Sequence, residues 1–400
     1  MRAKQFLAKK AIAAAMVGIA LCGFSAVGVS AAEPVSDQKP IVLKTMGSLF
    51  FGGSVTQNEN GETFHGDHGY AQFYVPQNSR QYPIVMWHGI GQSGRSFEST
   101  PDGREGYQAL LTRDDWPVYI IDQPRRGRAG RTQSKMPDNN TPTTTMESGV
   151  WSAFRMGRWI PPAPASFFAN AQVPHDAWTI DQFMRQQTGD TGELPRTPEH
   201  RAFMAKTVRA LFEQTGPGIL MTHSNSGQFG WATGIEAPEL VKAIVAYEPG
   251  QHAFPEGEKP ADVVSPIEAV NRIMQPQMVP MEEFMKLTKM PILLVYGDNI
   301  AEKPSTVFNE EVWRLSFARA KQFVEAVNRH GGDATLMHLP SMGIKGNTHA
   351  AFADLNNRQI ADLLEKWLAD KHLDGRDVPH QGPQKKVMDY GIPLVESQKQ

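Results

Sequence analysis

Near the middle of the chain stands the run Gly218-Ile219-Leu220-Met221-Thr222-His223-Ser224-Asn225-Ser226-Gly227. Its first four residues are apolar and typical of a buried strand, and a helical pattern begins near Gln228. Ser224 therefore falls at a sharp turn between a strand and a helix, a position that holds a serine hydroxyl above a sheet as a nucleophile. Such turns commonly have glycine two residues before and after the serine. Thr222 and Ser226 stand there instead, so the interpretation needs support from other parts of the chain.

The rest of the chain alternates between strand and helix patterns. This alternation predicts a mainly parallel central sheet with helices on both faces. A hairpin is expected at 54–69 because Asn60-Gly61 and Gly66-Asp67 are turn signals. Thr197 and Pro198 predict the N-cap and first residue of a helix that continues to about Thr215. Further strands are expected at 70–75, 83–87, 116–122, 218–221, 239–247, 291–298 and 334–339, and further helices from near 228 to 235, at 309–330 and at 356–370.

Residues 132–196 break this alternation. The segment is rich in Pro, Met, Phe and Trp and has no amphipathic period. It predicts short helices and loops folded over an active site, as a cap or lid that accepts an apolar or aromatic group. A structural insertion without substrate contact is the alternative. Whether the segment moves as a lid is left open.

The first 32 residues have the pattern of a secretory signal peptide. Basic residues occupy 2–10, an apolar stretch follows, and Ser30-Ala31-Ala32 is a small-residue cleavage motif. Cleavage near Ala32 would deliver the protein to the periplasm or the medium. We therefore expect a signal peptide at 1–32, a core at 33–131 and 197–372, a cap at 132–196 and a loosely packed tail at 373–400.

Composition excludes several classes of protein. Without residues 1–32 the chain would have 36 basic and 42 acidic residues and no cysteine, because Cys22 is the only one. Cysteine catalysis and thiolate metal sites are thereby excluded from the mature chain. A basic loop at 123–131 lacks interleaved aromatic residues, so we interpret its arginines as partners of nearby carboxylates and expect no nucleic acid partner. No later segment reaches the ~20 apolar residues that cross a bilayer, so no membrane association is expected after cleavage.

A serine nucleophile needs a base, and the base needs an acid that orients it. His349 is the best candidate for the base, because it follows the last predicted strand in a Gly-rich loop, late in the chain. His88 and His223 adjoin other predicted site elements, and His338 lies within a strand pattern. Two acids remain open: Asp298 and Glu248 each follow a predicted parallel strand, so both lie at the same sheet edge.

A Gly-rich loop, His88-Gly89-Ile90-Gly91-Gln92-Ser93-Gly94, follows the strand at 83–87. Glycines let a backbone N–H turn toward a substrate oxygen, so the loop predicts half of an oxyanion hole. A plain structural loop is the alternative.

Six motifs together resemble a family. The chain is similar, over about residues 45–370, to a small family of secreted bacterial α/β-hydrolase esterases typified by an Alcaligenes esterase with a Ser-Glu-His triad. The resemblance implies that the acid is Glu248, that Asp298 is structural, and that the N–H groups of Ile90 and Asn225 form the oxyanion hole. The motifs are His88-Gly89-Ile90, Thr100-Pro101-Asp102-Gly103-Arg104, Ile121-Asp122-Gln123 with Arg126-Gly127-Arg128, His223-Ser224-Asn225-Ser226-Gly227, Glu248-Pro249-Gly250 and Gly346-Asn347-Thr348-His349.

These roles predict a secreted serine hydrolase that cleaves carboxylic esters through an acyl-enzyme, with a small-molecule ester as substrate, no cofactor and no metal. An amide, lactone or carbon–carbon bond hydrolase with the same residues is the first alternative. An inert binding protein of the same fold is a remote one. The oligomeric state and the natural substrate are not predicted.

Overall fold

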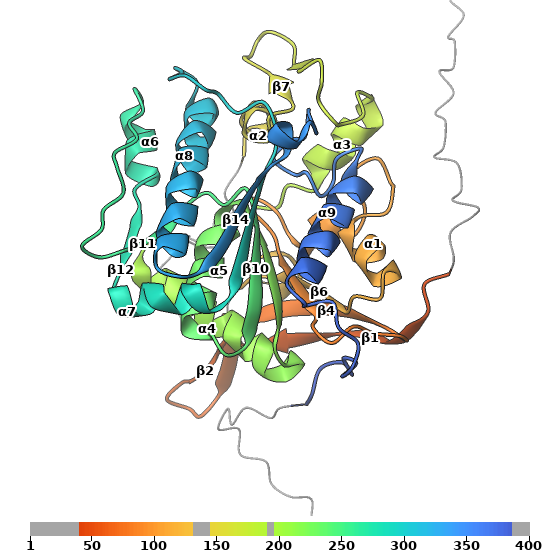
Figure 1. The fold of residues 1–400 in the computed structure, drawn as a ribbon. Coiled ribbons are helices and arrows are strands. Elements are labelled where there is room, and N and C mark those ends of the chain that lie inside the picture. The colour runs from red at the N-terminus through yellow and green to blue at the C-terminus, as the bar shows by residue number, and fades with distance from the viewer. Residues whose placement is uncertain (1–39, 131–144, 190–195, 386–400) are drawn as a thin grey trace, which may run out of the picture. The chain divides into compact units, whose positions relative to one another are not determined.

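A mixed sheet of eight strands runs through the middle of the fold (Figure 1). The computed structural model describes residues 40–130, 145–189 and 196–385. The strand order is β1-β4-β6-β5-β9-β10-β13-β14. In chain order these strands are β1 Leu43–Phe51, β4 Gly69–Pro76, β5 Ile84–Trp87, β6 Val118–Asp122, β9 Gly218–His223, β10 Val241–Tyr247, β13 Pro291–Tyr296 and β14 Asp333–His338.

Only β4 runs against its neighbours. It pairs antiparallel with β1 and β6, whereas every pair from β6 to β14 is parallel. The parallel strands β5 and β9 are buried at every residue, as expected of strands covered on both faces. The edge strand β1 instead alternates between exposed and half-buried residues.

Helices cover both faces of the sheet. Along β5, Val85 and Trp87 pack into one hydrophobic layer, and Ile84 and Met86 pack into the other, because successive side chains point to opposite faces. Helices α4, α5 and α8 close the first layer, and α1 and α9 close the second (Figure 1). The helices are α1 Tyr107–Arg113, α2 Glu147–Ala153, α3 Ala177–Arg185, α4 Pro198–Thr215, α5 Gly227–Glu236, α6 Glu268–Ile273, α7 Met281–Phe284, α8 Phe308–Arg329 and α9 Asn357–Asp370.

Helix α4 begins where its capping residues predict. The Thr197 hydroxyl accepts a hydrogen bond from the His200 N–H at 3.2 Å, and Pro198 is the first helical residue. The helix ends at Thr215 before Gly216, whose φ is 80°. Gly216 lets the chain turn directly into β9, which delivers Ser224.

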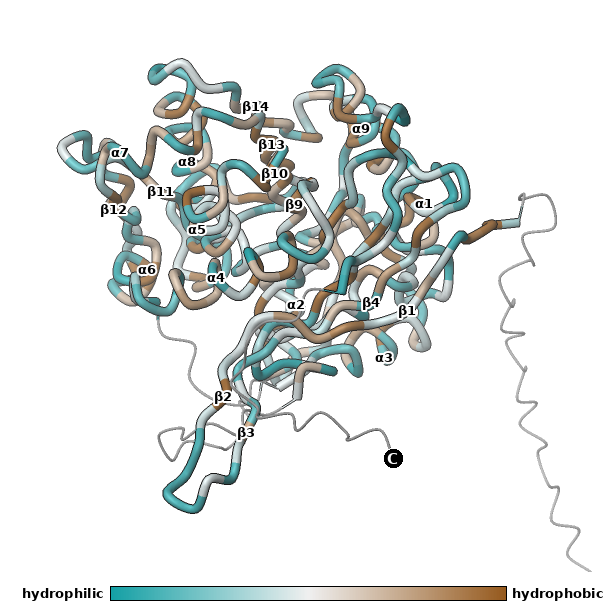
Figure 2. The backbone as a smooth tube through the Cα atoms, turned by 90° about the horizontal axis from the view of Figure 1, so that it is seen from below, coloured by the Kyte–Doolittle hydropathy of each residue, from teal (hydrophilic) through white to brown (hydrophobic). Residues whose placement is uncertain are grey.

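Three short two-stranded sheets lie outside the central one. The predicted hairpin is present as antiparallel β2 Ser54–Gln57 and β3 Thr63–Gly66. The hairpin projects from the rest of the fold and has a hydrophilic tip (Figure 2). The residues of β9, β10 and β13, in contrast, are mostly hydrophobic and lie inside the fold (Figure 2). The other two sheets pair β7 Gly157–Arg158 with β8 Ser166–Phe167, and β11 Ala253–Pro255 with β12 Gln277–Val279.

The described part of the predicted cap, 145–189 and Arg196, contains α2, β7, β8 and α3, the short elements expected from its lack of periodicity. These elements lie at the top of Figure 1. They belong to the same compact unit as the sheet. The predicted signal peptide at 1–32 lies outside the described residues. Among the described residues, no helix has the length and apolarity to cross a bilayer.

The described part of the expected C-terminal tail, residues 373–385, makes contacts with the body of the fold. Within 373–385, His380 is buried, and its Nε2 lies 2.8 Å from the Tyr119 hydroxyl. The Gln81 N–H donates to the Gly375 oxygen at 2.9 Å. The polar, Pro-rich composition of 373–400 hid this docking, because single buried contacts leave no periodic pattern.

Candidate active site

The predicted nucleophile lies where β9 ends. Ser224 has a φ of 57°, in the left-handed region that residues other than glycine rarely adopt, and it is 8% exposed. Ser226 supports the turn: its hydroxyl accepts a hydrogen bond from the His223 N–H at 2.9 Å and lies 2.9 Å from the Trp87 carbonyl oxygen. A hydroxyl at the usual glycine position therefore ties the turn to β5.

Two glycines that follow Ser224 allow the turn to pack closely against neighbouring segments. A Cβ on Gly227 would lie 2.4 Å from the Cβ of Pro249, and a Cβ on Gly230 would lie 2.9 Å from the Cγ2 of Thr222. The first turns of α5 thus pack closely against the chain. The glycines of this elbow are displaced along the sequence, and Thr222 is accommodated by Gly230.

Glu248 and His349 meet at the carboxyl ends of the parallel strands. The His349 Nδ1 lies 2.6 Å from the Glu248 Oε2, and both side chains are 2% exposed. Glu248 directly follows β10 with a φ of 44°. The His349 N–H donates to the Phe154 carbonyl oxygen at 3.0 Å, so a cap residue contacts the histidine.

Burial alone would raise the pKa of Glu248. The positive charge of Arg155 and the hydrogen bond from His349 outweigh it and hold this pKa at about 2. The pKa of His349 is lowered, first by burial and further by Arg155, although Glu248 opposes both. The structure therefore pairs an ionised carboxylate with a neutral imidazole at neutral pH.

Asp298 lies nearby but makes different contacts. Its Oδ2 accepts hydrogen bonds from the Gly346 N–H at 2.8 Å and the Asn170 Nδ2 at 3.0 Å, and its Oδ1 accepts from the Asn299 N–H. Its own N–H donates to the Asn347 oxygen at 2.8 Å. The carboxylate of Asp298 thus holds the loop before His349, and only Glu248 pairs with the imidazole.

The other candidate histidines have structural contacts. His88 is buried with its Nδ1 2.9 Å from the Gly89 oxygen, and burial lowers its pKa to about 4. The His223 Nε2 lies 3.0 Å from the His349 carbonyl oxygen, and burial depresses the pKa of His223 well below its usual value. The His338 Nδ1 pairs with the Ser341 hydroxyl at 2.7 Å.

The predicted oxyanion residues line the same cavity as Ser224. Ile90 and Asn225 both face it, and within the described part of the chain neither backbone N–H donates a hydrogen bond. The Asn225 Oδ1 accepts from the Gln228 Nε2 at 2.8 Å. A Cβ on Gly89 would lie 3.1 Å from the Ser224 Cβ, so glycine lets this loop approach the elbow.

The cavity beside Ser224 and His349 holds about 180 Å³. Phe154 from the cap and Trp313 from α8 contribute to its wall, and their rings lie 5.1 Å and 4.0 Å from the His349 ring. The remaining lining residues are Ala153, Arg196, His223, Gln228, Gly250, Gln251, Ile273, Met274, Phe308, Asn309 and Val312. The lining thus combines aromatic and aliphatic side chains with polar ones.

Sequence reasoning missed two buried ionisable residues at the site. Arg155 pairs with Glu248 through two hydrogen bonds, and nothing in its aperiodic segment marks it. Asp354 accepts hydrogen bonds from the Thr348 N–H and hydroxyl, each at 2.7 Å, and so braces the residue before His349. Its closeness in sequence to His349 was the one available signal.

The Thr100–Arg104 motif braces the same loop from the other side. The Arg104 Nη1 donates to the Asn357 Oδ1 at 3.0 Å, and its Nη2 donates to the Asp354 carbonyl oxygen at 3.2 Å. The Arg104 Nε pairs with Asp102 at 2.6 Å.

The basic loop has the structural role predicted for it. Arg125 pairs with Asp67 at 2.8 Å, and Arg128 pairs with Asp122 at 2.8 Å. The Arg126 Nη1 donates to the Gln92 carbonyl oxygen at 3.0 Å. These arginines bind the loop to the surrounding chain.

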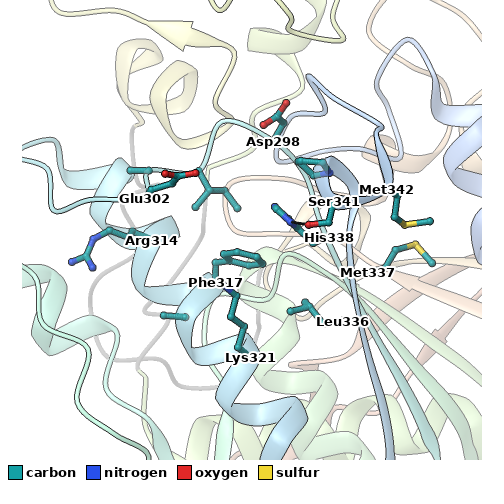
Figure 3. Close-up of a pocket in the computed structure, with 14 residues that line it drawn as sticks. Asp298, Glu302, Arg314, Phe317, Lys321, Leu336, Met337, His338, Ser341 and Met342 are labelled. Carbon is teal, nitrogen blue, oxygen red and sulfur yellow. Dashed lines mark hydrogen bonds between the residues drawn. The ribbon is translucent and has the colours of Figure 1, made fainter.

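A larger pocket of about 810 Å³ lies between α8 and β14 (Figure 3). Phe317 and Lys321 of α8 and His338 of β14 line it together with Asp298. Neither Ser224 nor His349 lines this larger pocket, so it is distinct from the cavity beside the proposed nucleophile. Among the described residues, no cluster of three or more His, Cys, Asp or Glu side chains could hold a metal ion.

Comparison with known proteins gives two informative likenesses. A fungal protein named "Probable secreted lipase phiG" (Fungal sp. strain ATCC 74256) is 28% identical over 327 residues, which cover 75% of this chain and 85% of that protein. A solved structure titled "The Atomic Resolution Structure of a Novel Bacterial Esterase" is 28% identical with a TM-score of 0.65, over 83% of this chain and 97% of that one. No protein-family model matches.

Proposed function

We propose that this chain is an α/β-hydrolase that cleaves carboxylic esters through an acyl-enzyme formed on Ser224. The observation that carries the proposal is the 2.6 Å contact between His349 and Glu248 beside a cavity that Ser224 also lines. The left-handed φ of Ser224 supports it, because strained backbone clusters at active sites.

The mechanism follows from these contacts. With its Nδ1–H donating to Glu248, His349 has Nε2 available to take the proton of Ser224. The alkoxide attacks the ester carbonyl carbon, and the N–H groups of Ile90 and Asn225 bind the resulting oxyanion, each contributing ~3 kcal/mol to transition-state stabilisation. The alcohol leaves with the proton from His349. Water then attacks the acyl carbon while His349 takes its proton, and His349 returns that proton to Ser224 as the carboxylic acid leaves.

The substrate is proposed to be a small ester. The cavity of about 180 Å³ lies below the ~300–1,000 Å³ of pockets that enclose drug-sized ligands. Phe154 and Trp313 offer aromatic surface, so a short or compact apolar acyl group fits best. A long fatty acyl chain would have to leave the cavity.

Secretion is part of the proposal. The fungal relative is named as a secreted lipase, and residues 1–32 have the sequence pattern of a signal peptide. Expression of the full chain in a bacterial host, followed by fractionation and N-terminal sequencing, tests this. Retention of residues 1–32 in a cytoplasmic product would contradict it.

Activity is tested with p-nitrophenyl esters from acetate to palmitate. Ser224→Ala is expected to abolish hydrolysis, and Glu248→Ala is expected to lower kcat far more than Asp298→Ala, because only Glu248 pairs with His349. Acetate to butyrate esters should be the best substrates. Unchanged activity in Ser224→Ala would contradict the mechanism. A larger loss of kcat in Asp298→Ala than in Glu248→Ala would contradict the choice of Glu248 as the acid.

A further inference from the structure

The buried arginine of the cap lies against the proposed acid. Arg155 follows helix α2 with a φ of 53°, and its side chain is 4% exposed. The preceding residue, Phe154, accepts the backbone hydrogen bond of His349. The chain thus turns at Phe154–Arg155, where one residue contacts the base and the next contacts the acid.

The Arg155 guanidinium donates three hydrogen bonds at this site. Its Nη1 donates to the Glu248 Oε2 at 2.7 Å, its Nη2 donates to the Glu248 Oε1, and its Nε donates to the Asp298 carbonyl oxygen at 2.8 Å. The fork therefore fixes the plane of the carboxylate. Asp298 supplies the third anchor through its backbone, so its side chain is not needed for this role.

The carboxylate is fully engaged as a result. Oε1 also accepts from the Gly297 N–H at 2.7 Å, and Oε2 also accepts from the His349 Nδ1 at 2.6 Å. Each oxygen has two donors, and one belongs to Arg155 in both cases. Rotation of the Glu248 carboxylate away from His349 would break both arms of the pair.

The pair also changes the charge next to the base. Arg155 and Glu248 together are neutral, so a proton on His349 would leave a net positive charge in a buried site. The other groups nearby do not offset it: His223, 4.5 Å away ring to ring, has a depressed pKa, and the pKa of Asp354 is raised to about 7. Glu248 also acts electrostatically on Tyr296 of β13 and His338 of β14, and the Asp298 carboxylate follows β13.

We propose that Arg155 is a positioning residue for Glu248, which fixes the carboxylate from the cap and places a positive charge beside it, next to His349. This inference rests on the proposed function. Arg155 does not line the cavity beside Ser224, so it acts through Glu248 and makes no contact with substrate.

The test is the pH dependence of kcat/KM for p-nitrophenyl acetate in the full chain and its variants. The wild-type acidic limb should have an apparent pKa below 6.5. Arg155→Met should raise the apparent pKa of that limb by about one unit, because a positive charge near His349 is lost. It should also lower kcat about tenfold or more with little change in KM, because the Glu248 carboxylate is no longer held in place. Arg155→Lys should keep the limb near the wild-type position and lower kcat by less, because a lysine keeps the charge without the fork.

Arg158→Met is the matched control. Arg158 lies three residues away in the cap, its side chain is 73% exposed, and its contact with Glu310 is a loose 3.8 Å. The control removes the same charge and should leave both the limb and kcat unchanged. A purely structural role for Arg155 would lower stability in Arg155→Met without moving the limb.

Three results would overturn the inference: a wild-type limb at or above 6.5, a folded Arg155→Met with an unmoved limb, or an Arg155→Lys with wild-type kcat. If Arg155→Met does not fold, the wild-type limb and Arg155→Lys decide. The Ser224→Ala variant distinguishes failure of the proposed function from failure of the inference about Arg155. Full activity in that variant removes the mechanism, whereas an inactive Ser224→Ala with an unmoved Arg155→Met limb removes only the role of Arg155.

Discussion

At the scale of single residues, the site concentrates unusual backbone. Ser224, Glu248 and Arg155 have φ values of 57°, 44° and 53°. Residues held in such sparsely populated regions cost ~1–3 kcal/mol each, and they persist where neighbours over-determine them. Here the neighbours are the Ser226 hydroxyl at the elbow and the arginine–carboxylate pair at the acid.

Gly89→Ala tests how tightly the elbow is enclosed. The added Cβ would lie 2.9 Å from the His223 Nδ1 and 3.1 Å from the Ser224 Cβ, and His223 is held by its contact with the His349 oxygen. We expect kcat/KM for p-nitrophenyl acetate to fall about a hundredfold, because small displacements of reacting groups have effects of that size.

Gly149→Ala in helix α2 is the control, because none of the described atoms beyond its chain neighbours and its own helix backbone lies within 4 Å of the added Cβ, and its φ is not in the left-handed region. It should keep full activity. Equal activities in the two alanine variants would show that the loop tolerates a side chain next to the elbow.

The sequence predicts Ser224 as the nucleophile because a strand and a helix flank it, and His349 as the base because it follows the last strand. Both residues line one cavity in the structure, and His349 contacts Glu248. The choice of Glu248 over Asp298 came from resemblance, since both follow parallel strands. Arg155 could not be found, because its partner is 93 residues away and no local pattern marks a buried ion pair.

At the scale of elements, the loop between β14 and α9 sets the position of His349. Asp354 accepts three hydrogen bonds there, two from Thr348 and one from the Asn347 Nδ2 at 2.9 Å. Burial nevertheless raises its pKa to about 7, and these hydrogen bonds oppose that rise only in part. The loop therefore carries a carboxyl whose ionisation costs folding free energy.

Asp354→Asn tests this cost. With a pKa of 3.8 in the unfolded chain and about 7 when folded, Asp354 contributes stability that is fully present below pH 3.8 and lost as pH rises through 7. The loss approaches ~4 kcal/mol as an upper bound. Asparagine keeps the shape without the charge, because its oxygen can accept from Thr348 N–H while its amide faces the hydroxyl.

The measurement is urea unfolding of both proteins at pH 5 and pH 8. The wild type should lose more free energy of unfolding between these two pH values than Asp354→Asn does. Parallel losses in the two proteins would contradict the buried titration of Asp354.

Element prediction succeeded where capping or length gave a signal. Helix α4 begins and ends as expected because Thr197, Pro198 and Gly216 mark its limits. The boundaries of the cap helices could not be predicted, because α2 and α3 are only seven and nine residues long. Short elements of this kind leave little periodicity to read.

At the scale of the whole molecule, the cap is tied to the body at several points. The Trp313 Nε1 donates to the Ala153 oxygen at 2.7 Å, and the Asn309 Nδ2 donates to the Gly149 oxygen at 3.1 Å. The Gln172 N–H donates to the Gly346 oxygen at 2.8 Å, close to the histidine loop. The described cap is thus bonded both to α8 and to the loop that holds the base.

Trp313→Phe tests the contribution of one such bond. The ring is retained, but the Ala153 oxygen loses its donor, so the free energy of unfolding should fall by about 1 to 3 kcal/mol. Urea denaturation measures the change. Trp178→Phe is the control, because Trp178 is 51% exposed, and an equal loss in both variants would mean that the bond to the cap contributes nothing.

Phe154 joins the cavity beside Ser224 to the proposed base, His349. Its ring lines the cavity and packs edge-on against the His349 ring, while its carbonyl oxygen holds the His349 backbone. An acyl group too bulky for the cavity would push on Phe154 and so displace the imidazole that must collect the serine proton. Discrimination between acyl chains would then appear mainly as a lower kcat, and poor substrates would behave as slowly converted competitors.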